Sequence, residues 1–174
     1  MLGGKGANLA EMSNMGIPVP PGFTITTEAC VDYLAQRAVP EGMFDAVRES
    51  MRWLERGTGK VFGGAERPLL VSVRSGARSS MPGMMDTVLN LGLNDDSVEG
   101  LAKQTDDERF AFDSYRRFLA MYGRIVLDID GEHFERLLDT AKEGDGATTD
   151  ADITPETLRR LCDRYKDVVR RETG

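Results

Sequence analysis

The chain has 174 residues and a net charge of −7, with 40% hydrophobic residues, a composition typical of a globular protein long enough to bury its own core. No segment approaches the roughly 20 consecutive apolar residues that cross a bilayer, and no uniformly basic face for DNA or RNA is present. We therefore expect a soluble, cytoplasmic protein that binds neither membrane nor nucleic acid. Two cysteines and one histidine without metal-type spacing argue against a zinc site or a disulfide framework.

The composition changes near Asn94–Ser97. Residues 1–95 carry nine Lys/Arg against ten Asp/Glu, whereas residues 96–174 carry 13 against 19, so the acidity belongs to the second part. Thirteen of the 19 glycines and six of the seven prolines precede residue 96. We expect an α+β lobe at 1–95 and an all-α helical subdomain at 96–174.

The first part alternates short helical and strand-like patterns, punctuated by glycine and proline. Period-two alternation in the last of these patterns places Val71 and Val73 on one face of a strand and Ser72 and Arg74 on the other. The expected elements are a helix at 7–15 that stops at Gly16, an extended connection at 17–22, a strand at 23–26, a helix from a Thr27 cap to Leu34, a helix from Met43 that ends at Gly57, and two strands at 69–75 and 87–93 joined by the loop 76–86.

The second part has apolar residues at helical spacing in three successive segments. Thr105 and Glu108 form a capping-box pattern before the first, a turn at 128–131 precedes the second, and Thr154 followed by Pro155 opens the third. We expect these stripes to form a core and assign them no chemistry; Cys162 is interpreted as a small buried apolar residue rather than a nucleophile. The stripes comprise Ala111, Tyr115, Phe118, Leu119 and Tyr122; Phe134, Leu137, Leu138 and Ala141; and Leu158, Leu161, Cys162, Tyr165, Val168 and Val169.

Two motif-like segments do not satisfy their motifs, and the one histidine is assigned no chemistry. The segment 56–60 lacks the first glycine of a phosphate-binding P-loop, and Val61 stands where Ser or Thr would bind the metal. We read it as a helix end and a turn. The segment 128–131 begins like a calcium-binding loop, but its glycine comes two positions too early. His133 has a polar setting and is interpreted as an ordinary surface histidine.

Two segments have a pattern that suits phosphate binding. Gly3-Gly-Lys-Gly6 leads directly into a helix and so combines backbone N–H groups, the positive end of a helix dipole and the ammonium of Lys5; the alternative is a flexible tail. Arg74 ends a strand beside a loop rich in Gly, Ser and Met, where a guanidinium could hold phosphoryl oxygens. The alternative there is a surface arginine next to a hairpin loop.

Three stretches resemble the nucleotide-binding N-terminal part of the pyruvate phosphate dikinase family. They are Leu2-Gly-Gly-Lys-Gly-Ala-Asn-Leu-Ala-Glu-Met12, Gly16-Ile-Pro-Val-Pro-Pro-Gly-Phe-Thr-Ile-Thr-Thr27, and the run from Val71 to Leu93 that contains Ser80-Met-Pro-Gly-Met-Met-Asp-Thr87. The resemblance is strong over residues 2–94 and weaker over 95–174. Phosphoenolpyruvate synthases are similar to the first stretch and share a Val-Arg-Ser motif, but diverge at residues 80–87.

The resemblance implies an ATP-grasp-like nucleotide-binding lobe, incomplete in this chain. The family converts ATP, phosphate and pyruvate to AMP, diphosphate and phosphoenolpyruvate through a phosphohistidine. Lys5 and Arg74 would then contact the ATP phosphates, and Arg74 would also stabilise the charge of the transferring phosphoryl group. The loop would cover the nucleotide, with Gly83 allowing close backbone approach. The loop-side contacts implied are Gly76, Ser80, Met81, Gly83, Met85, Asp86 and Thr87.

The resemblance also implies a larger parent, meaning the longer polypeptide of which this chain would be a segment. Its other parts would hold the second half of the cleft with the carboxylates for Mg²⁺, the phosphohistidine domain and the pyruvate-binding barrel, and we expect the parent to be a homodimer. No metal ligand is expected in this chain, which alone should be inactive, bind ATP no tighter than about millimolar, and tend to self-associate. The alternatives are a sister phosphotransferase such as phosphoenolpyruvate synthase, or a stand-alone nucleotide-binding or interaction module without catalysis.

Overall fold

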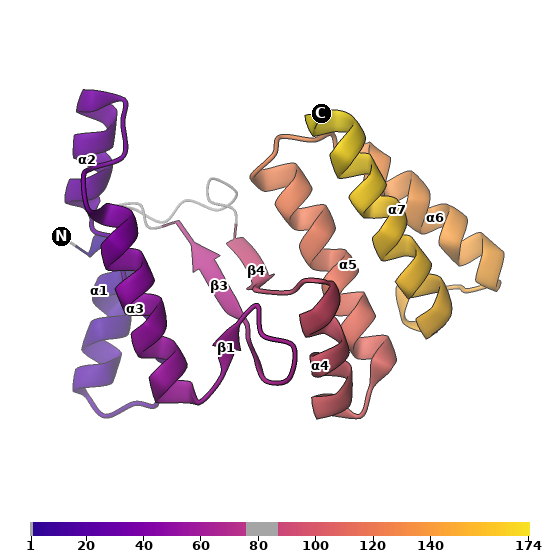
Figure 1. The fold of residues 1–174 in the computed structure, drawn as a ribbon, viewed down its shortest axis with the longest axis horizontal. Helices are drawn as coiled ribbons and strands as arrows, with labels where there is room; N and C mark the ends of the chain where they lie inside the picture. Colours follow the sequence, from indigo (N-terminus) through magenta and orange to yellow (C-terminus); the bar gives the residue numbers. More distant parts are fainter. Residues whose placement is uncertain (1, 76–86) are drawn as a thin grey trace. The chain divides into compact units, whose positions relative to one another are not determined.

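The computed structural model describes residues 2–75 and 87–174 (Figure 1). Contacts between residues divide the described chain into two units. The first unit contains residues 2–59 together with 74 and 75, and the second contains residues 60–73 and 87–174. This division differs from the expected boundary at residue 95, because the segment 60–73 and the strand that follows residue 86 group with the C-terminal helices. The mixture of helices with two small sheets is consistent with the expected α+β class.

The first unit consists of three helices: α1 (Gly3–Asn14), α2 (Thr27–Gln36) and α3 (Met43–Thr58). Two expected starts are wrong: α1 begins at Gly3 rather than residue 7, and the N-cap of α2 is Thr26 rather than Thr27. The expected end of α3 at Gly57 is also wrong. The helix continues to Thr58 and ends where Gly59 adopts a left-handed φ of 65°, a conformation that favours glycine.

The strand expected at residues 23–26 is not formed. Phe23 and Ile25 are 40% and 53% exposed and the segment is not hydrogen-bonded into either sheet. A segment with high β-propensity becomes a strand only when its backbone can hydrogen-bond to a neighbouring strand. Residues 23–26 have no such neighbour in either sheet, so they form an extended connection.

Four short strands follow α3, and all of their residues except Arg74 group with the second unit. Strands β1 (Val61–Phe62) and β2 (Pro68–Leu69) pair in parallel, and β3 (Val71–Arg74) pairs with β4 (Thr87–Leu91). The two longer strands confirm the expected pair, although both are shorter than predicted. The β1–β2 pair was not predicted, because two residues per strand are too few to show a period.

Helix α4 (Asp95–Thr105) follows β4 and was also not predicted. Asn94 caps it, accepting hydrogen bonds from the N–H groups of Asp96 and Ser97 at 2.9 and 2.7 Å, while the Ser97 hydroxyl accepts one from the N–H of Asn94. The expected capping box at Thr105 is therefore wrong. Thr105 is the last residue of α4, and its hydroxyl donates back to the carbonyl of Leu101.

Three longer helices complete the second unit: α5 (Glu108–Ile125), α6 (Glu132–Asp145) and α7 (Pro155–Thr173), with a short 3₁₀ turn at Asp150–Asp152. Asp107 caps α5 by accepting from the N–H of Phe110, and Thr154 caps α7 as predicted. The turn before α6 is also confirmed: Asp128 has a left-handed φ of 55°, and the Asp130 carboxylate accepts from the N–H of Glu132.

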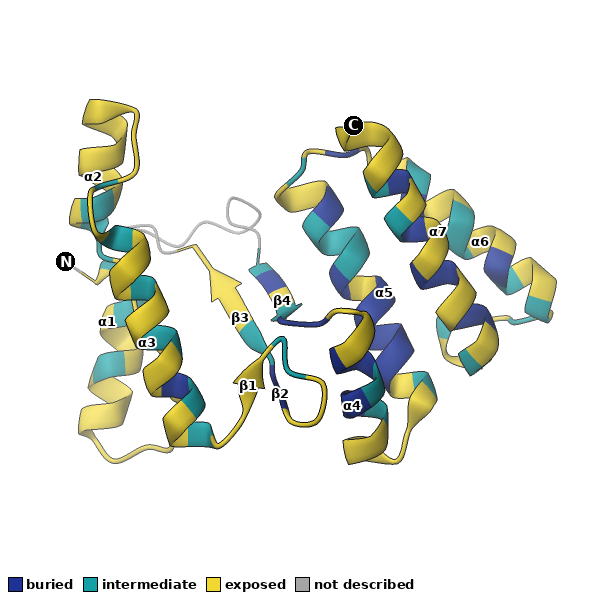
Figure 2. Ribbon diagram, viewed as in Figure 1, coloured by how far each residue is buried: buried dark blue, intermediate teal, exposed yellow. Residues whose placement is uncertain are grey.

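The core of the described chain lies almost wholly in the second unit (Figure 2). Helix α5 is its centre, since it packs on α4, on β4 and on α7, while α6 packs on α7. Gly123 lets α5 approach α6, because a Cβ atom there would lie 2.6 Å from Cζ of Phe134. Leu54 is the one buried hydrophobic side chain among residues 2–59. The expected stripes supply much of this core, including Ala111, Phe118, Phe134, Leu158, Leu161, Cys162 and Tyr165.

Candidate nucleotide-binding site

The first turn of α1 contains the glycine-rich segment with Lys5. Helix N-termini present backbone N–H groups that have no partner within the helix. Leu2 stands at the N-cap position, no side chain caps the helix, and the first turn carries no acidic residue. Gly3 has a left-handed φ of 67°. The glycines therefore form the helix start itself, rather than a tail that precedes it.

Gly6 brings this turn close to the extended connection. A Cβ atom at Gly6 would lie 3.2 Å from both the Thr24 hydroxyl oxygen and the Leu2 Cβ. Residue 24 follows the segment 17–22, whose three prolines restrict the backbone. The absence of a side chain at Gly6 thus allows the turn that carries Lys5 to rest on Thr24.

Arg74 is the last residue of β3 and its side chain is exposed. Val73 before it is 50% exposed, so the apolar face that the alternation predicts for this strand is only partly covered. Within residues 2–75 and 87–174, neither Arg74 nor Lys5 forms an ion pair with a carboxylate.

The predicted site residues are divided between the two units. Lys5 and Arg74 lie in the first unit on different elements, and Thr87 opens β4 in the second. The other predicted contacts lie outside the described residues: Gly76, Ser80, Met81, Gly83, Met85 and Asp86.

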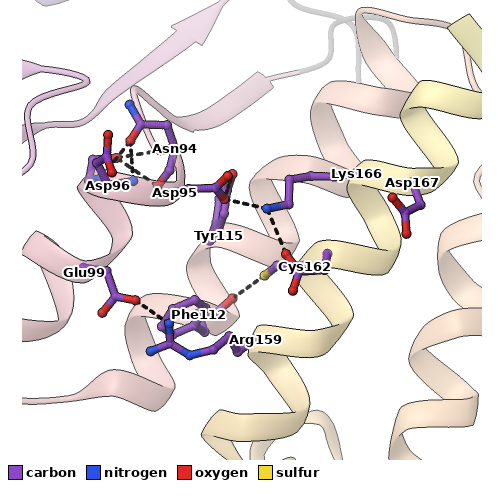
Figure 3. A network of polar contacts seen from close by, with 12 residues as sticks. Asn94, Asp95, Asp96, Glu99, Phe112, Tyr115, Arg159, Cys162, Lys166 and Asp167 are labelled. Atoms are coloured by element: carbon purple, nitrogen blue, oxygen red, sulfur yellow. Dashed lines mark hydrogen bonds and ion pairs between the residues drawn. The ribbon is translucent and has the colours of Figure 1, made fainter. Parts of the chain in front are cut away.

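A polar network that the sequence did not predict joins α4, α5 and α7 (Figure 3). Asp95 Oδ1 accepts from Lys166 Nζ at 2.7 Å and from Tyr115 Oη at 3.0 Å, and the Lys166 hydrogen bond holds the pKa of Asp95 below its usual value. Arg159 pairs with Glu99 and Glu108 and lies 4.2 Å from the centre of the Phe112 ring.

This network borders a cavity of about 310 Å³, but its cations and its central carboxylates satisfy one another. It holds three helices together and presents no charge that requires a ligand. No local pattern could have predicted it, because Asp95 and Lys166 are separated by 71 positions.

The chain's thiol and imidazole groups show no catalytic arrangement. Cys162 is 2% exposed, and burial raises the pKa of its thiol to about 12, which fits the interpretation of a buried apolar residue. His133 Nε2 lies 3.8 Å from Glu172 Oε1 on the surface. Among residues 2–75 and 87–174, no three His, Cys, Asp or Glu side chains are grouped so as to hold a metal ion.

No helix of the described residues has the length and apolar character needed to span a membrane. The charged residues on α6 and α7 instead form ion pairs at the surface, as Arg136 does with Glu132 and Arg170 with Asp167.

Comparison with known proteins identifies relatives along nearly the whole chain. Residues 1–56 match the family described as "Pyruvate phosphate dikinase, AMP/ATP-binding domain". The chain is 53% identical over 97% of its length to a pyruvate, phosphate dikinase of Clostridium symbiosum, and 54% identical over 99% to that of Rhizobium meliloti (strain 1021). It is 51% identical over its full length to the Giardia intestinalis enzyme.

The chain spans only 19% to 20% of the length of these relatives. The similarity includes the helices from α4 to α7, for which the motifs alone gave only a weak resemblance, so both units are part of the related segment.

Proposed function

We propose that this chain, which matches one segment of the pyruvate, phosphate dikinases, forms part of an ATP-grasp-like nucleotide-binding domain. In this domain Lys5 and Arg74 bind the ATP phosphates. The observation that carries the proposal is that both cations lack a carboxylate partner among the described residues while one of them lies in an uncapped, glycine-rich helix start. An ATP phosphate chain provides the missing negative charge for both.

These groups suit phosphoryl transfer, in which a protein mainly positions the phosphates and neutralises charge. The N–H groups of the first turn of α1 and the Lys5 ammonium meet charge that is already present in bound ATP. A guanidinium at Arg74 can hold two oxygens of the transferring group at once. Lys5 is therefore assigned to binding, and Arg74 to both binding and the transfer step.

For the whole protein we propose conversion of ATP, phosphate and pyruvate to AMP, diphosphate and phosphoenolpyruvate by way of a phosphohistidine, in a cytoplasmic homodimer. The reaction of the parent would use Mg²⁺. The described residues do not fit a Mg²⁺ site, because they contain no cluster of three suitable ligands; the proposed ligands belong to other parts of the parent. The remaining contacts, Thr87 and the six loop residues from Gly76 to Asp86, stay predictions from the sequence.

The test uses the full-length parent enzyme, supplied with ATP and pyruvate in the presence and absence of inorganic phosphate. We expect phosphoenolpyruvate, AMP and diphosphate to form only when phosphate is present. Lys5→Ala should weaken ATP binding and slow the reaction, whereas Lys103→Ala, an exposed lysine of α4, should change neither. Product formation without phosphate would contradict the proposed reaction, and wild-type ATP affinity in Lys5→Ala would contradict the assigned site.

A further inference from the structure

A cavity of about 450 Å³ lies between α6 and α7 in the second unit. Its volume falls within the range of about 300–1,000 Å³ that is usual for small-molecule sites. None of its residues belongs to the proposed nucleotide contacts. Its lining combines two cations, a hydroxyl group, a carboxylate and an apolar part, contributed by Arg160 and Arg164, Thr157, Asp145, and Ala141 with Leu161.

The two arginines of the cavity have few partners in the chain. They are four positions apart, so they project from the same side of α7. Within residues 2–75 and 87–174, Arg164 forms no hydrogen bond or ion pair, and Arg160 forms one hydrogen bond, in which its Nη2 donates to the Thr157 hydroxyl at 3.0 Å. The other three arginines of α7 each pair with a carboxylate: Arg159, Arg170 and Arg171.

Asp145 does not neutralise this pair of guanidinium groups. Its Oδ1 accepts from the Thr157 hydroxyl at 2.7 Å, and its Oδ2 accepts from the N–H and the hydroxyl of Thr154 at 2.8 and 2.9 Å. These hydrogen bonds, that of the Thr154 N–H most of all, hold the pKa of Asp145 below its usual value. Two guanidinium groups against one carboxylate leave an excess of positive charge in the lining, although the whole chain carries −7.

Thr157 links the carboxylate to the arginines. It is 8% exposed, and its hydroxyl donates to Asp145 while it accepts from Arg160. The guanidinium of Arg160 is thus held in place before any ligand arrives, which lowers the entropy cost of binding. Arg164, one turn further along the helix, adds a second set of donors on the same side.

We propose that this cavity binds a small organic phosphate. The phosphate group lies between Arg160 and Arg164, because guanidinium groups present paired N–H donors that match phosphate oxygens. The organic part packs on Ala141 and Leu161. Inorganic phosphate alone would leave most of the cavity to water, since one water molecule takes up only about 30 Å³. The site is independent of the proposed nucleotide contacts, because it consists only of residues from α6 and α7.

Titration of the ¹⁵N-labelled chain with phenyl phosphate at constant ionic strength, followed by NMR, tests the proposal. The second unit has its own core, and the amide signals of Gly144, Thr157 and Leu161 report on the cavity directly. We expect these signals to shift with a Kd of about 1 mM or lower. Inorganic phosphate should bind at least about 10-fold more weakly, because it lacks the apolar part. Phenol, which lacks the phosphate, should cause no shift.

Three variants locate the phosphate. Arg164→Gln should raise the Kd at least about 10-fold, because it removes charge-assisted hydrogen bonds. Arg170→Gln removes the same charge from another exposed position of α7 and should raise the Kd less than about 2-fold. Lys5→Ala should leave the Kd unchanged, which separates this site from the proposed nucleotide contacts. Unshifted core signals verify that each variant is folded.

Three results would overturn the proposal. The first is the absence of shifts at the cavity, or equal shifts with sodium chloride. The second is equal weakening by Arg164→Gln and Arg170→Gln, which would show general charge attraction rather than a site. The third is inorganic phosphate that binds as tightly as phenyl phosphate, which would identify an adventitious ion only.

Discussion

Gly100 on α4 lies directly against the backbone of Ala65, so that a Cβ atom at Gly100 would be only 1.8 Å from the Ala65 carbonyl oxygen. Two hydrogen bonds attach the same turn to this helix: Asn94 Nδ2 donates to the carbonyl of Gly63 at 3.0 Å, and Gln104 Nε2 donates to that of Glu66 at 2.8 Å. The turn between β1 and β2 is thus held against α4 by contacts at the start, the middle and the end of the helix.

We predict that Gly100→Ala destabilises the chain by about 2–3 kcal/mol or more, because the backbone of the turn must move away from the new methyl group. Gly144 on α6 provides the matched control, since a Cβ atom there would meet nothing within 4 Å. Gly144→Ala should stabilise by about 0.5–1 kcal/mol through helix propensity. Urea denaturation followed by circular dichroism measures both. Equal stability of the two variants would refute the close approach.

Asn94 has two separable roles, as the cap of α4 and as a donor to Gly63. Asn94→Ala should cost about 1–2 kcal/mol, since the N–H groups of Asp96 and Ser97 lose their acceptor. Asn94→Asp keeps the acceptor and loses only the donor, so its unfolding midpoint in urea should lie between those of wild type and Asn94→Ala. A midpoint for Asn94→Asp at or below that of Asn94→Ala would show that capping is not the main contribution.

Arg116 is the centre of a buried ionic group on α5. Its Nε lies 2.8 Å from Asp113 Oδ1 and its Nη2 lies 2.7 Å from Asp150 Oδ2, and the side chains of Arg116 and Asp113 are 7% and 11% exposed. Burial alone would raise the pKa of Asp150, but the hydrogen bond and charge of Arg116 hold it below its usual value.

Removal of the guanidinium leaves the buried Asp113 carboxylate with only the more exposed Arg117, whose Nη2 lies 2.9 Å from Asp113 Oδ2. Arg116→Ala should therefore cost about 3 kcal/mol, the lower end of the usual range for a broken buried ion pair. Arg170→Ala removes an exposed arginine from an exposed pair with Asp167 and should leave the unfolding midpoint unchanged. Calorimetric melting temperatures compare the two. If the melting temperature of Arg116→Ala falls no further than that of Arg170→Ala, the Arg116 ion pairs are not buried as described.

The buried thiol of Cys162 makes stability depend on alkaline pH. Burial raises its pKa from 9.0 to about 12 in the folded chain, so this contribution is fully present below pH 9 and declines as the unfolded thiol ionises above it. The slope approaches about 1.4 kcal/mol per pH unit and ends near pH 12, where the folded thiol also ionises. Between pH 9 and 10 the free energy of unfolding should therefore fall more steeply in wild type than in Cys162→Ala. Identical slopes would show that Cys162 is solvated in the folded state.

The sequence predicted the elements whose pattern is long and local. The stripes of α5, α6 and α7 each span several turns, and Thr154–Pro155 is a strong start signal for α7. Helix α4 was not predicted, because its apolar positions are few: Val98, Leu101 and Ala102. In addition, Thr105 and Glu108 together match a capping-box pattern, which placed a helix start where α4 ends. The strand expected at 23–26 failed for the opposite reason: its pattern was clear, but strand formation depends on a partner that no local pattern specifies.

Only those residues of the candidate site that belong to a local sequence motif could be predicted. Glycines before a helix and an arginine at a strand end can be recognised locally, which is why Lys5 and Arg74 were selected. The ionic groups around Asp95 and Arg116 depend on residues tens of positions apart, as with Asp95 and Lys166, and folding alone brings them together.

The central claim is that Arg74 acts on the phosphoryl transfer step, and single-turnover phosphorylation of the parent enzyme from ATP tests it most directly. Arg74→Lys retains the charge but loses the paired donors, so ATP affinity should change little while the transfer rate falls by about 10²–10³. Arg67→Lys, at an exposed arginine of the second unit, is the control and should transfer at the wild-type rate. If Arg74→Lys also transfers at the wild-type rate, Arg74 is a surface residue and the account of the site is wrong.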